Sequence, residues 1–144
     1  MRGFSEFAEL CRRLAETPGR LDKRRLTAEY LRALEGGDVA PAVDFLTGRA
    51  FPATDPRALN VRWLPAAASA PLGPPLALTD VASAFADVAA TSGAGARRAR
   101  DERLAALVAR ASPHEREILG RIVSGEMRTG VSDGLVLEIG RAHV

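Results

Sequence analysis

The chain has 144 residues, of which 47% are hydrophobic and 26% are charged, and its formal net charge is +2. This length suits one compact domain that buries roughly two-thirds of its surface, and the composition excludes an intrinsically disordered chain. No stretch approaches the ~20 apolar residues of a membrane span, and the N-terminus lacks the apolar core of a signal peptide. We therefore expect a folded, monomeric cytoplasmic protein that does not contact a membrane.

Three helices are predicted in the first third of the chain. Apolar residues recur at helical spacing over residues 5–15, 22–35 and 38–48, with short turns between them. Such short connections indicate antiparallel neighbours. Cys11 lies on the apolar side of the first segment, so we expect a buried thiol, and Asp38 is expected to cap the third helix.

Helical periodicity fades between Arg49 and Pro75, where six prolines accumulate. We interpret residues 65–75 as a Pro- and Ala-rich link between two helical halves, at about 1–64 and 76–138. The apolar run 59–64 is expected to dock on the core as a turn of helix, with Trp63 as a packing residue.

Three further helices are predicted in the second half: one from Thr79 that ends at Gly93, and two at about 96–111 and 112–124. A capped start at Ser132 opens another. Thr79 is a suitable N-cap for the first of them. Ser112, Pro113 and Glu115 form a capping box, in which Ser and Glu side chains satisfy each other's backbone amides. Because no segment alternates with period two, the sequence predicts an all-α fold.

Residues with catalytic chemistry are sparse. His114 lies in the first turn of a capped helix and His143 lies beside the chain end. No cysteine or histidine cluster is spaced for a metal ion, and no glycine-rich loop ends in the Lys-Ser or Lys-Thr of a phosphate site. We therefore expect no catalytic residue, no metal and no cofactor within this chain.

Two turns combine glycine, arginine and a helix end. The first, Gly93 to Ala96, opens a helix whose N-terminal amides and dipole would attract an anion, and arginines follow at 97, 98 and 100. The second is Met127-Arg128-Thr129-Gly130. These residues favour phosphate binding, and the two turns together could grip one backbone. The same pattern also fits plain helix ends with a solvated arginine face, and the residues alone leave both interpretations open.

The order of these segments resembles a known family. The runs 78–81, 85–89, 93–95 and 115–132 resemble the N-terminal domain of ATP-dependent DNA ligases. That family's first glycine turn reads Gly-x-Gly-Ser followed by Lys, where this chain has Ala96 and Arg100. Its second reads Leu-Arg-Ile-Gly, where this chain has Met127-Arg128-Thr129-Gly130. Weaker similarity covers the first half, including Arg20 and Lys23, and the short link is similar to that of compact bacterial ligases.

The resemblance implies that the chain binds nicked duplex DNA without sequence preference, as one domain of a ligase acting in replication, repair or recombination. The residues expected to contact DNA are Arg20, Gly93, Gly95, Ala96, Arg97, Arg98, Arg100, Arg121, Arg128, Thr129 and Gly130. In the family, a nucleotidyltransferase domain with a Lys-x-Asp-Gly motif uses ATP and Mg²⁺, and an OB domain accompanies it. Lys23 is the single lysine and is followed by Arg24-Arg25, so this chain should be inactive alone.

Two other functions fit the sequence. A helical protein-interaction module could dock a partner through the link and Trp63, and a non-catalytic nucleic-acid adaptor could share the arginine turns without any ligase domain.

The last residues have a separate origin in our interpretation. Residues 139–144 match the translation of a widely used sequencing adapter, so we expect a non-native tail with little apolar surface to bury.

Overall fold

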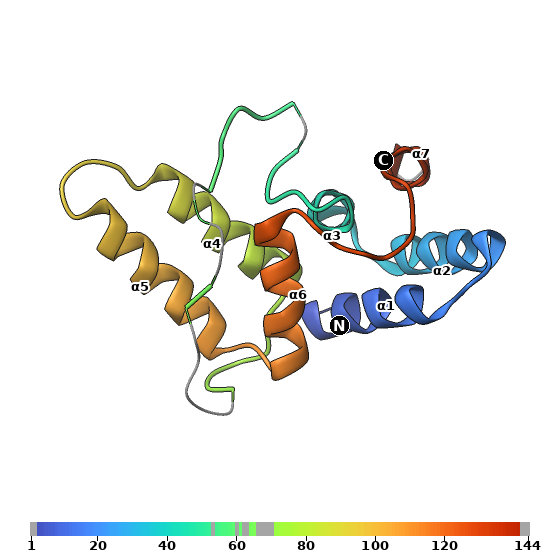
Figure 1. Ribbon diagram of the computed structural model, residues 1–144, viewed down its shortest axis with the longest axis horizontal. Coiled ribbons are helices and arrows are strands. Elements are labelled where there is room, and N and C mark those ends of the chain that lie inside the picture. Colours follow the sequence, from blue (N-terminus) through green and yellow to red (C-terminus); the bar gives the residue numbers. More distant parts are fainter. Residues whose placement is uncertain (1–2, 53, 60, 62–63, 66–70, 142–144) are drawn as a thin grey trace.

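The computed structural model describes all residues except 1–2, 53, 60, 62–63, 66–70 and 142–144 (Figure 1). Over the described residues it contains seven α-helices and no strand, which confirms the all-α class. They are α1 (Phe4–Glu16), α2 (Arg20–Ala33), α3 (Gly36–Leu46), α4 (Leu78–Ala90), α5 (Ala96–Ala109), α6 (Pro113–Ser124) and α7 (Asp133–Arg141). None of these helices is long and apolar enough to cross a membrane.

The helix ends follow local side-chain chemistry. Before α6, the Glu115 amide donates to Ser112 Oγ at 3.2 Å and the Ser112 amide donates to Glu115 Oε1 at 2.8 Å. This confirms the predicted capping box. The expected caps at Thr79 and Asp38 are wrong, because both residues lie inside the first turns of α4 and α3. Asp80 instead accepts the Ala77 amide at 2.8 Å and fixes the start of α4.

Four phenylalanines form the centre of the core. Phe4 and Phe7 of α1, Phe45 of α3 and Phe85 of α4 are fully buried. The Phe45 ring lies 6.4 Å from that of Phe4, 6.0 Å from that of Phe7 and 5.7 Å from that of Phe85, each in edge-to-face geometry. Such pairs add about 0.5–1.5 kcal/mol each beyond the burial of their area. Three helices are therefore held around one ring.

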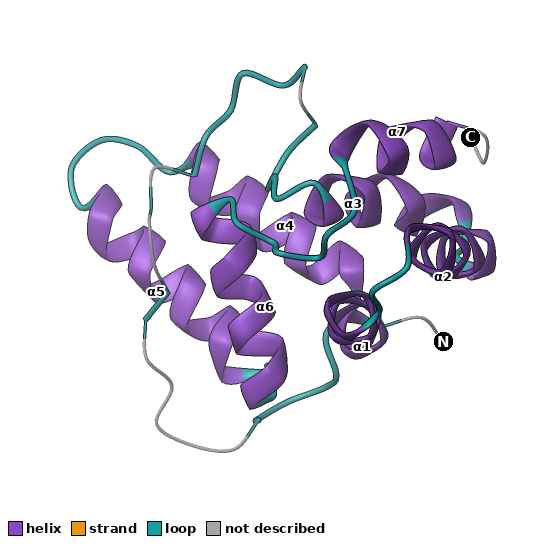
Figure 2. Cartoon of the chain, turned by 45° about the vertical axis from the view of Figure 1, so that its right-hand side comes forward, coloured by secondary structure: helices purple, strands orange, loops and turns teal. Residues whose placement is uncertain are grey.

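Packing runs across the two sequence halves, which share one continuous core. The helix α7, from the second half, packs against α2 and α3, and α6 packs against α1 (Figures 1 and 2). His114 reinforces the second contact, because its Nε2 lies 2.9 Å from the Ala8 carbonyl oxygen, which can only accept. Cys11 is buried at the same helix pair, as expected, and burial raises the pKa of its thiol to about 12.

The described part of the proline-rich link is anchored to the helices. The Leu72 amide donates to the Ala109 carbonyl at 2.8 Å, and Arg110 donates to the carbonyls of Pro74 and Pro75 at 3.0 and 3.2 Å. The apolar run 59–64 docks through Leu59, which is buried, but its described residues form no helix, so that expectation is wrong. Trp63 and residues 66–70 lie outside the described residues.

The structure corrects one expectation about the C-terminal tail. Ile139 is only 7% exposed and belongs to the core, and α7 continues to Arg141. Gly140 is buried against Val43 of α3, where an added Cβ would lie 2.7 Å from the valine Cγ2. The tail therefore buries apolar surface from its first residue. Its non-native origin stays a prediction, and residues 142–144 are outside the described part.

Replacing Ile139 by Ala should lower the free energy of unfolding by roughly 2–5 kcal/mol, because the change removes buried methyl groups from the contact of α7 with the core. Replacing the exposed Glu138 by Ala should change it by less than about 0.5 kcal/mol. Urea unfolding followed by circular dichroism measures both variants. Equal stability of the two would show that α7 does not pack on the core in solution.

Candidate nucleic-acid interface

The turn between α4 and α5 leaves a helix N-terminus open. Gly95 immediately precedes α5 and has φ +76°, a left-handed conformation that glycine adopts without strain. A Cβ added to Gly93 or Gly95 would meet no atom within 4 Å. A ligand could therefore approach this backbone closely.

The first turn of α5 carries unpaired donors and positive charge. The Ala96 and Ala99 amides donate to Gly93 and Gly95, at 3.2 and 3.1 Å. Within the described residues, no bond uses the amides of Arg97 and Arg98, and no side chain caps the helix. Arginine at a helix N-terminus opposes the helix dipole, where an acidic residue would stabilise it. The arrangement contributes little to stability and suits an anion.

The arginines of this turn differ in their partners. Arg98 is 88% exposed and pairs with Glu102 at 3.2 Å, whereas no partner is found for the exposed Arg97 among the described residues. Arg100 turns back instead, and its Nε and Nη2 donate to the Thr91 carbonyl at 3.2 and 2.8 Å. Arg100 thus binds the carbonyl of Thr91 at the C-terminal end of α4 and holds the α4–α5 turn. Its position in the sequence did not indicate this contact.

The second predicted group lies between α6 and α7. Arg121 donates to Glu117 at 2.8 Å and to the Met127 carbonyl at 3.4 Å, so it holds the segment that leaves α6. Arg128 has φ +55° and a 74% exposed side chain that pairs with Glu126 at 3.3 Å. Thr129 is buried, and its Oγ1 accepts the Val131 amide at 3.3 Å. Most of these groups therefore stabilise the turn itself.

The two groups are separated in the fold. The α4–α5 turn lies at one end of the longest axis, and the segment between α6 and α7 runs beside α3 toward α2 (Figures 1 and 2). The structure brings Arg20 to the second group, because Arg20 and Gly130 line the same cavity. Lys23 and Arg24 line it too, although neither was among the residues expected to contact DNA. A shared ligand would have to contact the two turns at separate points.

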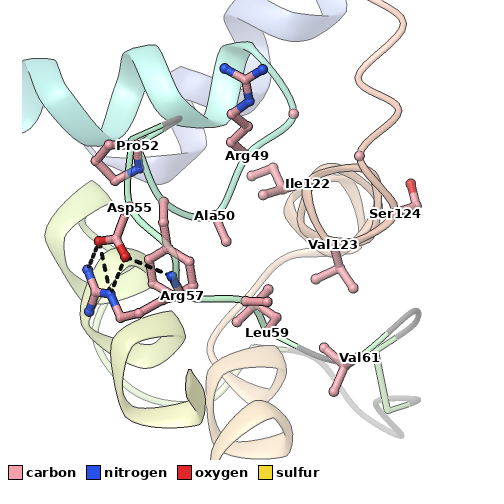
Figure 3. Close-up of a pocket in the computed structure, with 14 residues that line it drawn as sticks. Arg49, Ala50, Pro52, Asp55, Arg57, Leu59, Val61, Ile122, Val123 and Ser124 are labelled. Atoms are coloured by element: carbon pink, nitrogen blue, oxygen red, sulfur yellow. Dashed lines mark hydrogen bonds and ion pairs between the residues drawn. The ribbon is translucent and has the colours of Figure 1, made fainter. Parts of the chain in front are cut away.

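A further cavity of about 350 Å³ lies between the segment after α3 and the C-terminal end of α6 (Figure 3). Its walls meet where Gly48 and Gly125 touch, since a Cβ added to Gly48 would lie 2.8 Å from the Gly125 carbonyl oxygen. Arg57 lies 4.4 Å from the centre of the Phe51 ring and pairs with Asp55 at 2.7 Å, and this bond lowers the pKa of the Asp55 carboxyl. Arg57 therefore has an acidic partner within this cavity, as Arg98 has in Glu102 at the α4–α5 turn.

Over the described residues, no group of three or more His, Cys, Asp and Glu side chains could hold a metal ion. Lys23 Nζ donates to the Thr129 carbonyl at 3.1 Å, so the single lysine is engaged in the fold. The arrangement can bind anions through amides and guanidinium groups.

Comparison with known proteins assigns the family. The sequence profile described as "DNA ligase N terminus" matches residues 3–64 and 66–139. The chain belongs to the DNA ligase N-terminal domain family. A probable DNA ligase of Anaeromyxobacter sp. strain K is 37% identical to this ligase-type domain over 135 residues, which cover 92% of the chain and 26% of that protein.

Two other relatives support this assignment and show how much of a ligase's length this chain covers. The probable DNA ligase of Anaeromyxobacter sp. strain Fw109-5 is 39% identical over 132 residues, covering 87% of this chain and 24% of its own. DNA ligase 1 of Korarchaeum cryptofilum is 29% identical over 165 residues, covering 94% and 30%. The ligase-type domain thus spans between 24% and 30% of the length of these three relatives.

Replacing Arg100 by Ala should lower the free energy of unfolding by about 1–2 kcal/mol, because two charge-assisted hydrogen bonds to Thr91 are lost. Replacing the exposed Arg97 by Ala should change it by less than about 0.5 kcal/mol. Thermal unfolding, with hydrogen exchange of the Gly93 to Arg98 amides, measures both. Unchanged exchange in the Arg100 variant would show that Arg100 does not hold the turn.

Proposed function

We propose that the domain binds duplex DNA at a nick, without sequence preference, by holding backbone phosphates at the open N-terminus of α5. One combination of features carries this proposal. No side chain caps the N-terminus of α5, the space beside Gly95 is open, and arginines occupy the first turn, where the helix dipole disfavours positive charge. Each feature costs stability or leaves it unchanged, and all three favour a bound anion. The family assignment supports DNA as that anion.

In this proposal the arginines have different tasks. Arg97 and Arg98 face solvent beside their own unpaired amides; Arg97 has no partner among the described residues, whereas Arg98 is paired with Glu102. Arg100 acts through the turn that it closes, and Arg121 likewise supports the turn that carries Arg128. Phosphate contacts of this kind position a protein on DNA but do not read bases. Binding should therefore be similar for all duplex sequences.

The parent protein is proposed to be an ATP-dependent DNA ligase that acts in replication, repair or recombination. Sealing would require the nucleotidyltransferase and OB domains that the resemblance implies, with ATP and Mg²⁺. We expect this domain to bind neither group itself, because Lys23 is bonded to Thr129 and lies in a context without Asp-Gly. The contribution of this domain is to hold the DNA.

Duplex binding should weaken with salt, with log affinity falling linearly against log salt by about 0.9 for each phosphate neutralised. Replacing Arg97 by Ala should weaken binding to all duplexes alike and reduce that slope by roughly one unit. Arg32, an exposed arginine in the last turn of α2, is the matched control and should leave the slope unchanged when replaced by Ala. Fluorescence anisotropy over a salt series measures this. Salt-insensitive binding to a protein, with none to DNA, would instead favour the interaction-module alternative.

Gly95 tests the backbone part of the site. The change Gly95→Asn keeps the charge and tolerates a left-handed backbone, but its side chain enters the open space before α5. Affinity for duplex DNA should fall while the salt slope and the melting temperature remain those of the parent domain. Unchanged affinity at equal stability would exclude close approach of a phosphate to this turn.

The chain should form no covalent adenylate, because its single lysine lacks the Asp-Gly context and is engaged by Thr129. Incubation with radiolabelled ATP and Mg²⁺, followed by denaturing electrophoresis, measures this directly. A labelled band that survives denaturation would place adenylation chemistry in this domain and contradict the proposal.

A further inference from the structure

The C-terminal end of α3 carries a carboxylate in an unfavourable place. Asp44 lies in the last turn of this helix and is partly buried. A helix C-terminus bears partial negative charge, which disfavours an anion there. Among the described residues no hydrogen bond reaches the Asp44 carboxylate, and burying an ionised group without such bonds costs free energy. Position, burial and missing donors therefore all favour the neutral carboxyl.

Two charged residues that follow α3 act on Asp44. Burial, the largest effect, raises the pKa of the Asp44 carboxyl to about 6, with Arg49 lowering it and Asp55 raising it. Asp55 accepts the amide of Arg57 at 2.9 Å and pairs with its guanidinium at 2.7 Å, so it stays ionised. The helices α4 and α7 also pack against α3. None of their charged residues acts on the Asp44 carboxyl; these residues are Asp80, Asp87, Asp133, Glu138 and Arg141.

The backbone at this helix end anchors the segment that leaves α3. We call residues 47–52 the strap. The Asp44 carbonyl oxygen accepts the Thr47 hydroxyl at 2.8 Å and the Arg49 amide at 2.9 Å. The Gly48 amide donates to the carbonyl of Phe45 at 3.0 Å. The residue with the disfavoured carboxylate is therefore also the one that holds the strap to α3.

The strap connects α3 to the end of α6. Phe51 is buried in the core, and a Cβ added to Gly48 would lie 2.8 Å from the carbonyl oxygen of Gly125, which ends α6. Figure 3 shows the strap facing the C-terminal end of α6 across the cavity of about 350 Å³. A change in how firmly the strap is held would therefore reach this cavity and the end of α6.

We propose that Asp44 is a proton-sensitive switch for the strap: its neutral carboxyl lets the strap pack closely against α6, and its ionised carboxylate, repelled by the helix end and by Asp55, loosens the strap. The switch is a property of the fold and goes beyond the proposed function. It makes the cavity wall and the end of α6 firmer in acid and weaker at neutral pH.

The sign of the effect follows from linkage between protonation and folding. The pKa of Asp44 in the fold, about 6, lies above its usual value of 3.8. Between these two values the folded chain holds a proton that the unfolded chain has lost. The contribution of Asp44 to stability is therefore present in acid and is lost as the pH rises through about 6. Above that pH the fold bears the cost of the charge.

The change Asp44→Asn removes the charge and keeps the size of the side chain. At pH 7.5 the unfolding equilibrium constant of this variant should be roughly ten- to hundredfold smaller than that of the parent chain, and at pH 4 the difference should shrink to about twofold. Urea unfolding at both pH values measures this. The matched control is Asp38→Asn in the first turn of the same helix, where the dipole favours an anion, and it should gain no stability at either pH.

Hydrogen exchange tests whether the effect acts on the strap. In the parent chain, protection of the Gly48 and Arg49 amides, corrected for intrinsic rates, should be lower at pH 7.5 than at pH 5.5 by about threefold or more. In the Asp44→Asn variant it should be the same at both. The Leu72 amide, which donates to Ala109 in the remote link, serves as the control and should not respond.

Three outcomes would overturn the proposal. The first is an Asp44→Asn variant that is no more stable than the parent chain at pH 7.5, or that fails to fold there. The second is an equal gain in stability at pH 4 and pH 7.5, which would show that protonation is not involved. The third is a gain in stability at pH 7.5 with unchanged protection of Gly48 and Arg49, which would show that the charge acts on the whole fold and not on the strap.

Discussion

The packing of three helices around Phe45 is the constraint on which the rest of the structure depends. This ring contacts those of Phe4, Phe7 and Phe85, and all four are fully buried. Burying such a side chain contributes about 1.5–3 kcal/mol, so this cluster fixes α4 relative to α1 and α3. Because α5 follows α4 after one short turn, the direction of its open N-terminus is set by the same cluster.

Arginine serves two purposes in this molecule. One group ends helices and joins segments by donating to backbone carbonyls, as Arg100, Arg110, Arg116 and Arg121 do. The planar guanidinium suits this task because it can reach one or two acceptors at once. The second group, exemplified by Arg20, Arg24 and Arg97, has no such partner among the described residues. Composition alone does not separate the groups, whereas the hydrogen bonds do.

Local features were predictable from the sequence, and tertiary ones were not. Helical periodicity located six of the seven helices of the described residues, and the seventh was indicated only by a capped start at Ser132. The Ser112 capping box was confirmed because its chemistry involves only four consecutive residues. Thr79 was misassigned because Asp80 reaches back to Ala77 and moves the start of α4. The meeting of Arg20 with Gly130 depends on α7 packing against α2, which no spacing encodes. Arg100 was predicted as a ligand contact, and its bond to Thr91 needed the fold.

The contact between Gly48 and Gly125 restricts which sequences can encode this fold. Both residues have a left-handed backbone, but their surroundings differ: a Cβ at Gly48 would strike the Gly125 carbonyl, whereas a Cβ at Gly125 would lie 3.7 Å from the Gly48 oxygen. Position 125 is limited by backbone strain alone, so asparagine can replace its glycine at modest cost. Position 48 is limited by strain and by space. In a redesigned sequence, position 125 could therefore vary while position 48 could not.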